Sequence, residues 1–148
     1  MKDGQFTRQE RTIIEWLKIC TAFLFVYGFV VSFYPHTLLR YFNGVGQAFF
    51  NFLNPPIAEA SFGYWWSGCV ASTLISLVAS FLARQNWLKN YTLIPMMILS
   101  KITTAVCLAV TMFLHPLQFY YLVTFAIEAV IGLMTWFYYA QARQSRPD

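Results

Sequence analysis

Four long stretches of apolar residues, separated by short polar or charged segments, make up most of the chain. They run from about 13 to 34, 60 to 83, 91 to 114 and 117 to 142. Each reaches the roughly 20 residues that a helix needs to cross about 30 Å of hydrocarbon. Because backbone N–H and C=O groups find no water in lipid, stretches of this length are stable there only as helices. The sequence predicts an all-α membrane protein, a four-transmembrane-helix antiparallel bundle in a single domain, residues 1–148.

The composition agrees with this class. Hydrophobic residues make up 58% of the chain and charged residues only 11%, whereas soluble domains have about 25% charged residues. A cleaved signal peptide is not predicted, because the first stretch leads into the bulky residues SerPheTyrPro at 32–35, and a cleavage site needs small residues. We expect an uncleaved first helix.

The basic residues lie mostly on one side of the predicted membrane. Eight of them precede or open the first stretch, join the second to the third, or follow the fourth: Lys2, Arg8, Arg11, Lys18, Arg84, Lys89, Arg143 and Arg146. Arg40 is alone on the other side. The positive-inside rule assigns the eight to the cytoplasm. We expect a multi-pass protein of the cytoplasmic (inner) membrane with both termini in the cytoplasm, and the net charge of +4 needs no nucleic-acid partner.

The connections differ in kind. The one around His115 and Pro116 is so short that the last two helices are expected to be antiparallel neighbours. The segment 35–58 is long, and its apolar residues recur at helical spacing with polar residues between them: Val45, Phe49, Phe52 and Leu53 against Gln47, Asn51 and Asn54. This pattern predicts a short amphipathic helix in the outer interface. Its role is either that of a lid or anchor, or that of a ligand-binding surface.

Small residues form a ridge on the second predicted helix. Gly68, Ser72, Ser76 and Ser80 recur four residues apart. Helices in lipid approach closely where such residues lie. The ridge is expected to face either a neighbour within the bundle or a partner protein, including a second copy of the chain.

Two ionisable residues lie near the predicted midplane, Lys101 and Glu128. Reflecting Lys101 through a turn centred at 115 and 116 gives position 130, so the two differ in depth by roughly 3 Å. Polar or small residues follow both at helical spacing and predict a polar seam: Ser100, Thr104, Cys107 and Thr111 on one helix, with Thr124, Gly132, Thr135 and Tyr139 on the other. The pair is either a structural salt bridge that sets helix register or a proton or ligand site.

Other reactive residues give weaker signals. His36, Arg40, Glu59 and His115 lie at helix ends on the outer side, either as solvated interfacial residues or as ligands and proton relays. Cys20, Cys69 and Cys107 fall in different apolar stretches and are expected to be inert packing residues. The chain has no catalytic motif and no metal-ligand spacing, so neither a cofactor nor a metal is predicted.

In size and layout the chain resembles small four-helix bacterial membrane proteins, DoxX-like proteins among them. The features that carry the resemblance are PheValTyrGlyPhe at 25–29 in a first helix that ends at Pro35, and Glu59 at the start of the second helix. The resemblance covers the first two helices and implies the four-helix layout. It assigns no residue a role.

Three functions follow as hypotheses. The first is a non-enzymatic bundle that binds a lipid or apolar ligand, or serves as an accessory subunit of a membrane protein. The second is a small proton-coupled transporter that uses Lys101 and Glu128. The third is a membrane redox or lipid-modifying enzyme that uses Cys or His residues at the outer face.

Overall fold

The computed structural model describes residues 6–53 and 59–145, with 59–65 described by their backbone alone. Within these ranges every regular element is a helix, and four helices are long and apolar enough to cross a membrane. The four are α1 (Arg8–Phe33), α3 (Glu59–Gln85), α5 (Ile94–Leu114) and α6 (Phe119–Gln144). The short elements are α2 (Pro35–Phe50), α4 (Trp87–Asn90) and the 3-10 helix η2 (Tyr91–Leu93). The predicted all-α four-helix bundle is confirmed.

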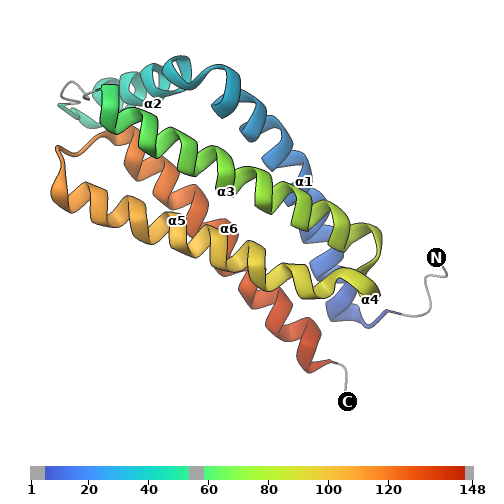
Figure 1. Ribbon diagram of the computed structural model, residues 1–148. Coiled ribbons are helices and arrows are strands. Elements are labelled where there is room, and N and C mark those ends of the chain that lie inside the picture. Colours follow the sequence, from blue (N-terminus) through green and yellow to red (C-terminus); the bar gives the residue numbers. More distant parts are fainter. Residues whose placement is uncertain (1–5, 54–58, 146–148) are drawn as a thin grey trace.

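The four long helices form a closed ring in which each packs against two others. Helix α1 contacts α3 and α6, and α5 contacts the same two helices from the opposite corner. We call the end with the start of α1, α4 and the end of α6 the terminal end, because the first and last described helices begin and end there (Figure 1). The opposite end, with α2 and the connection between α5 and α6, is the loop end (Figure 1).

Helix α1 begins five residues before the expected boundary at 13 because a capping box starts it. The Thr7 hydroxyl accepts a hydrogen bond from the Glu10 backbone N–H, and the Glu10 carboxylate accepts one from the Thr7 N–H. This reciprocal arrangement satisfies two backbone donors at the helix start. The helix ends at Phe33, since the residue before Pro35 is disfavoured in helical conformation.

Helix α2 is longer than the amphipathic segment that the sequence predicts. It begins at Pro35, whose fixed φ suits the first helical turn. It ends at Phe50 because Asn51 adopts the left-handed conformation (φ 52°) as the C-cap, so Phe52 and Leu53 follow the helix. The apolar pattern did not predict the first turns of α2, because they contain polar residues such as His36 and Arg40.

The boundaries of the last two spans also differ from those predicted. The third span, expected to begin at 91, starts as α4 and η2 and becomes a continuous α-helix only at Ile94, one residue before Pro95. The fourth, expected from 117 to 142, runs from Phe119 to Gln144.

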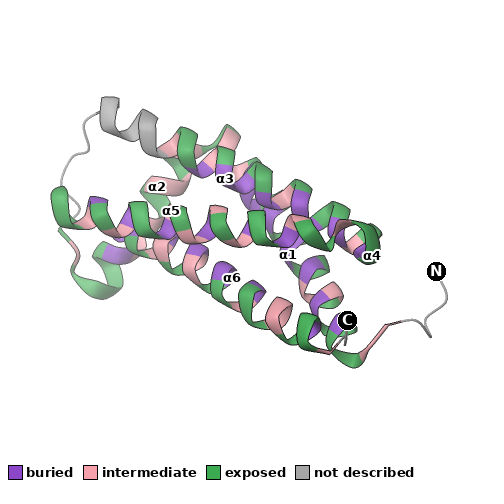
Figure 2. Cartoon of the chain, turned by 60° about the horizontal axis from the view of Figure 1, so that its bottom comes forward, coloured by how far each residue is buried: buried purple, intermediate pink, exposed green. Residues whose placement is uncertain are grey.

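Burial divides each long helix into an inner and an outer face (Figure 2). The inner face mixes apolar residues with hydroxyl groups, including Leu17 and Ser76, which are both 0% exposed. The outer face keeps large apolar side chains exposed, such as Phe25 at 65% and Phe113 at 90%. An outer surface this apolar is suited to hydrocarbon and not to water. The chain is a multi-pass membrane protein.

Candidate functional site

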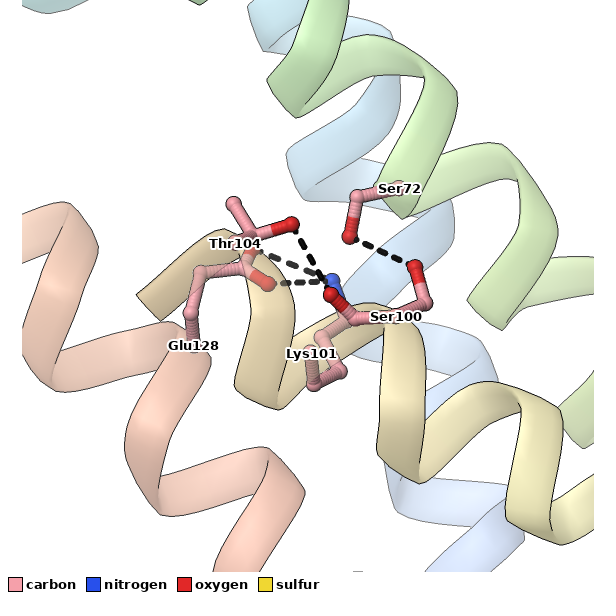
Figure 3. Close-up of polar contacts among 5 residues, drawn as sticks. All are labelled: Ser72, Ser100, Lys101, Thr104 and Glu128. Atoms are coloured by element: carbon pink, nitrogen blue, oxygen red, sulfur yellow. Dashed lines mark hydrogen bonds and ion pairs between the residues drawn. The ribbon is translucent and has the colours of Figure 1, made fainter. Parts of the chain in front are cut away.

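Lys101 and Glu128 meet in the central turns of α5 and α6 (Figure 3). The Lys101 Nζ lies 2.9 Å from the Glu128 Oε2 and donates a hydrogen bond of 3.0 Å to Oε1. Both side chains are 0% exposed. Gly132, one turn from Glu128, permits this approach, because a Cβ there would lie 3.2 Å from the Lys101 Cβ. The result is a closely packed ion pair that engages both carboxylate oxygens.

Helix α3 reaches the same level through hydroxyl groups. The Ser100 hydroxyl, next to Lys101 in the chain, donates a 3.0 Å hydrogen bond to the Ser72 hydroxyl (Figure 3). The Thr104 hydroxyl donates to the Ser100 carbonyl over 2.9 Å. Three helices therefore contribute polar groups around the charge pair.

Each of the four interfaces in the ring carries at least one such polar link. The pair Lys101–Glu128 joins α5 to α6, and Ser100–Ser72 joins α5 to α3. The Thr21 hydroxyl donates to the Ser80 hydroxyl over 3.1 Å between α1 and α3. The indole N–H of Trp16 donates to the Thr135 hydroxyl over 2.9 Å between α1 and α6. Apolar burial does not drive helices together in lipid. These polar links therefore help to determine which faces of the helices are in contact.

Three buried hydroxyl groups have no hydrogen-bond partner among the described residues: those of Tyr27, Thr73 and Ser76. The Glu128 Oε2 is contacted only through its ion pair with Lys101. These groups come from α1, α3 and α6, whose inner faces point to the bundle interior. Buried polar groups are usually paired, so this interior holds more hydrogen-bonding capacity than its own contacts use.

The other seam residues lie in different surroundings. Thr111, Thr124 and Thr135 are buried, and the first two donate to the carbonyls four residues earlier, Cys107 and Tyr120. Cys107 is exposed on the outer face of α5, and Tyr139 is half-buried near the terminal end.

Most of the small-residue ridge of α3 packs inside the bundle. Ser72, Ser76 and Ser80 are buried, and Ser72 contacts α5 while Ser80 contacts α1. Gly68 is exposed, and a Cβ there would meet nothing within 4 Å.

The candidate residues at the loop end lie at the surface where they are described. His36 and Arg40 are exposed on α2, and His115 is exposed after α5, while the side chain of Glu59 lies outside the described residues. No group of three or more His, Cys, Asp or Glu side chains placed to hold a metal ion occurs in the described part of the chain. Cys20 and Cys69 are buried, and all three cysteines are free thiols.

The sequence reasoning missed a second buried carboxylate, Glu10, at the terminal end. Its side chain is 1% exposed, and its Oε1 accepts a 3.0 Å hydrogen bond from the indole N–H of Trp87. The signal that could have found it is the pattern Thr7-x-x-Glu10 before an apolar run.

The sequence also did not predict a polar contact at the loop end, between Asn43 and the start of α6. The Asn43 side chain donates to the Gln118 side-chain oxygen over 2.8 Å and accepts from the Tyr120 N–H over 3.0 Å. It fastens α2 to the start of α6. No sequence pattern links residues 75 positions apart.

Comparison with protein families, with curated proteins and with solved structures gave no match. The function is therefore inferred from the chain's own geometry.

Proposed function

We propose that the protein is a non-enzymatic lipid-binding bundle of the membrane. The observation that carries this proposal is a groove of about 530 Å³ between α1 and α3. Its walls are apolar over most of their length and include Ala22, Phe25 and Val78. These helices are two of the four that are apolar enough to cross a membrane, so hydrocarbon chains surround the groove. The occupant is the acyl chain of a membrane lipid.

The groove reaches a positive charge at the terminal end. Arg84 lines it near the end of α3, with its guanidinium carbon 5.1 Å from the centre of the Phe81 ring. A basic residue at the end of an apolar groove complements the phosphate of a lipid headgroup. A second groove of about 400 Å³, lined by apolar residues of α1 and α6, offers a further acyl-chain surface.

The proposal includes the location of the protein. The bundle lies in the cytoplasmic membrane, and its terminal end faces the cytoplasm. This is supported by the basic residues at that end, Arg8, Arg11, Lys18, Arg84, Lys89 and Arg143, against Arg40 at the loop end.

A groove-filling variant tests lipid binding. The protein is extracted in mild detergent, and lipid retained per chain is measured by native mass spectrometry. We expect Ala22→Phe to lower retention by filling the groove, whereas Ala71→Phe, at an alanine on α3 that is also exposed but does not line the groove, leaves retention unchanged. We expect Arg84→Gln to weaken retention of anionic lipid about fivefold, since a basic residue near the surface contributes about 1 kcal/mol.

Lipid retention at background level in the wild type would contradict the proposal. So would equal retention by Ala22→Phe and Ala71→Phe. Recovery of a stoichiometric protein partner without lipid would instead favour the accessory-subunit hypothesis.

Proton-coupled transport is a second candidate, favoured by the fully buried Lys101–Glu128 pair and by the buried hydroxyls of Tyr27, Thr73 and Ser76, which have no hydrogen-bond partner among the described residues. Other buried titratable groups interact electrostatically with the pair: Tyr27 and Cys20 on α1, Cys69 on α3 and Tyr120 on α6. The double variant Glu128→Gln/Lys101→Met removes both charges together. If it folds in proteoliposomes and loses pH-dependent uptake, the pair carries protons. If wild type and double variant show the same pH response, this candidate is wrong.

A further inference from the structure

A cavity of about 170 Å³ lies at the terminal end, apart from the groove between α1 and α3. Residues from four elements line it: Glu10 from α1, Trp87 from α4, Tyr91 from η2, and Tyr139 and Arg143 from α6. An engineered cavity of about 150 Å³ holds a benzene molecule, so this one has room for a small headgroup.

One wall of the cavity combines a buried carboxylate with aromatic rings. Glu10 is 1% exposed, and its two oxygens accept hydrogen bonds from the Thr7 N–H (2.9 Å) and the Trp87 indole N–H (3.0 Å). The rings of Trp87 and Tyr91 lie 6.3 Å apart at 48°. A carboxylate beside tilted aromatic rings is the chemistry that binds an ammonium group.

The other wall carries the opposite charge. Arg143 is exposed at the end of α6 and lines the same cavity. A guanidinium binds phosphate through paired N–H donors. All the lining elements lie where the chain leaves the bundle, and this is the level at which lipid headgroups meet membrane helices.

We propose that this cavity binds a zwitterionic phosphoethanolamine headgroup, with the ammonium against Glu10 and the rings and the phosphate against Arg143. The site is independent of the groove between α1 and α3. A lipid and a free phosphoethanolamine share this chemistry, and the test separates them.

Glu10→Gln is the informative variant because glutamine also serves in a capping box. It removes the charge and retains the side-chain acceptor that starts α1. Tyr91→Leu removes one ring from a residue that is 41% exposed. Tyr41→Leu on α2, 67% exposed at the loop end, is the matched control for the ring, and Lys89→Gln is the control for the charge of Arg143.

The experiment reconstitutes the full chain in vesicles of equal phosphatidylethanolamine and phosphatidylglycerol with identical acyl chains. After mild-detergent extraction, the ratio of the two retained lipids is measured by native mass spectrometry. We expect the wild type to prefer phosphatidylethanolamine. Glu10→Gln reduces the preference about tenfold through loss of a charge-assisted bond, and Tyr91→Leu reduces it about threefold. Arg143→Gln lowers retention of both lipids at this site and leaves the ratio near the wild-type value.

Controls and groove variants define the outcomes that overturn the proposal. Tyr41→Leu, Lys89→Gln and Ala22→Phe are expected to leave the ratio unchanged, and the last of these separates this site from the lipid groove. A wild-type ratio near one overturns the proposal, as does a Glu10→Gln variant that loses thermal stability without change in the ratio, because Glu10 then only caps α1. Displacement of retained lipid by millimolar free phosphoethanolamine identifies a soluble ligand, and resistance to it identifies the lipid.

Discussion

Lys101 and Glu128 neutralise each other in a part of the bundle that has no contact with water. Both are 0% exposed, and Nζ lies 2.9 Å from Oε2. We predict that Glu128→Gln alone lowers the free energy of unfolding by about 3 to 5 kcal/mol, because it leaves an uncompensated buried charge. The double variant Glu128→Gln/Lys101→Met should recover most of the loss. Thermal unfolding in a single detergent measures both.

The exposed pair Glu15–Lys18 is the matched control for this prediction. Its side chains are 65% and 51% exposed, at a separation of 2.5 Å. An exposed ion pair contributes about 0.2 to 1 kcal/mol, so Glu15→Gln should change stability little. A double variant at Lys101 and Glu128 that is as unstable as Glu128→Gln would show that the two charges do not compensate each other.

The two buried carboxylates differ in how far the sequence reveals them. Glu128 interrupts a long apolar stretch, and reflection through the turn at 115 and 116 places it near Lys101. Glu10 lies among other charged residues, where a solvated side chain is the ordinary expectation. Its burial depends on Trp87, which is 77 positions away. Contacts over such separations follow from helix packing and not from a local pattern.

Helix α2 attaches to the bundle through a glycine. A Cβ on Gly46 would collide with the Phe119 Cβ and ring, whereas a Cβ on Gly44 would meet nothing within 4 Å. We predict that Gly46→Ala lowers the melting temperature and loosens α2. Gly44→Ala, in the same helix, should raise the melting temperature slightly, since alanine is favoured over glycine by about 1 kcal/mol within a helix.

Hydrogen–deuterium exchange across 35–50 reports the attachment of α2 directly. Faster exchange in Gly46→Ala than in Gly44→Ala supports contact with α6. Equal exchange and equal melting temperatures in the two variants would mean that α2 does not pack on Phe119.

The sequence predicts the four long helices well and their ends poorly. Length and hydropathy report the part of a helix that lies in hydrocarbon, so the central turns were located correctly. The ends depend on local chemistry: the Thr7 capping box extends α1, Asn51 ends α2, and Pro95 delays the continuous helix of α5. The interfacial helix was predicted to exist, but its first turns carry polar residues that the apolar pattern does not count.

At the scale of the whole molecule, polar links close the ring of helices. At least one link lies at each interface, from Thr21–Ser80 to Lys101–Glu128. A set of links around the whole ring fixes the rotation of every helix, because each long helix is held on two sides. This closure also fixes which residues face outward, so the apolar grooves and the cavity at Glu10 keep their shape.

The arrangement of the basic residues leads to a prediction about how the whole molecule lies in the membrane. Most of the described basic residues share the terminal end, and the positive-inside rule predicts that this end faces the cytoplasm. Single cysteines at exposed positions of the two ends, His115→Cys and Gln144→Cys, report the orientation in a variant whose native Cys20, Cys69 and Cys107 are alanine. We expect a membrane-impermeant maleimide to label His115→Cys in intact cells and Gln144→Cys only after permeabilisation. The cysteine-free parent is the labelling control, and unchanged lipid retention in it would show that lipid binding does not depend on the thiols. Labelling of Gln144→Cys in intact cells, with His115→Cys protected, would invert the orientation. The cavity at Glu10 would then face the outer leaflet, and the lipid supplied to it would have to come from that side.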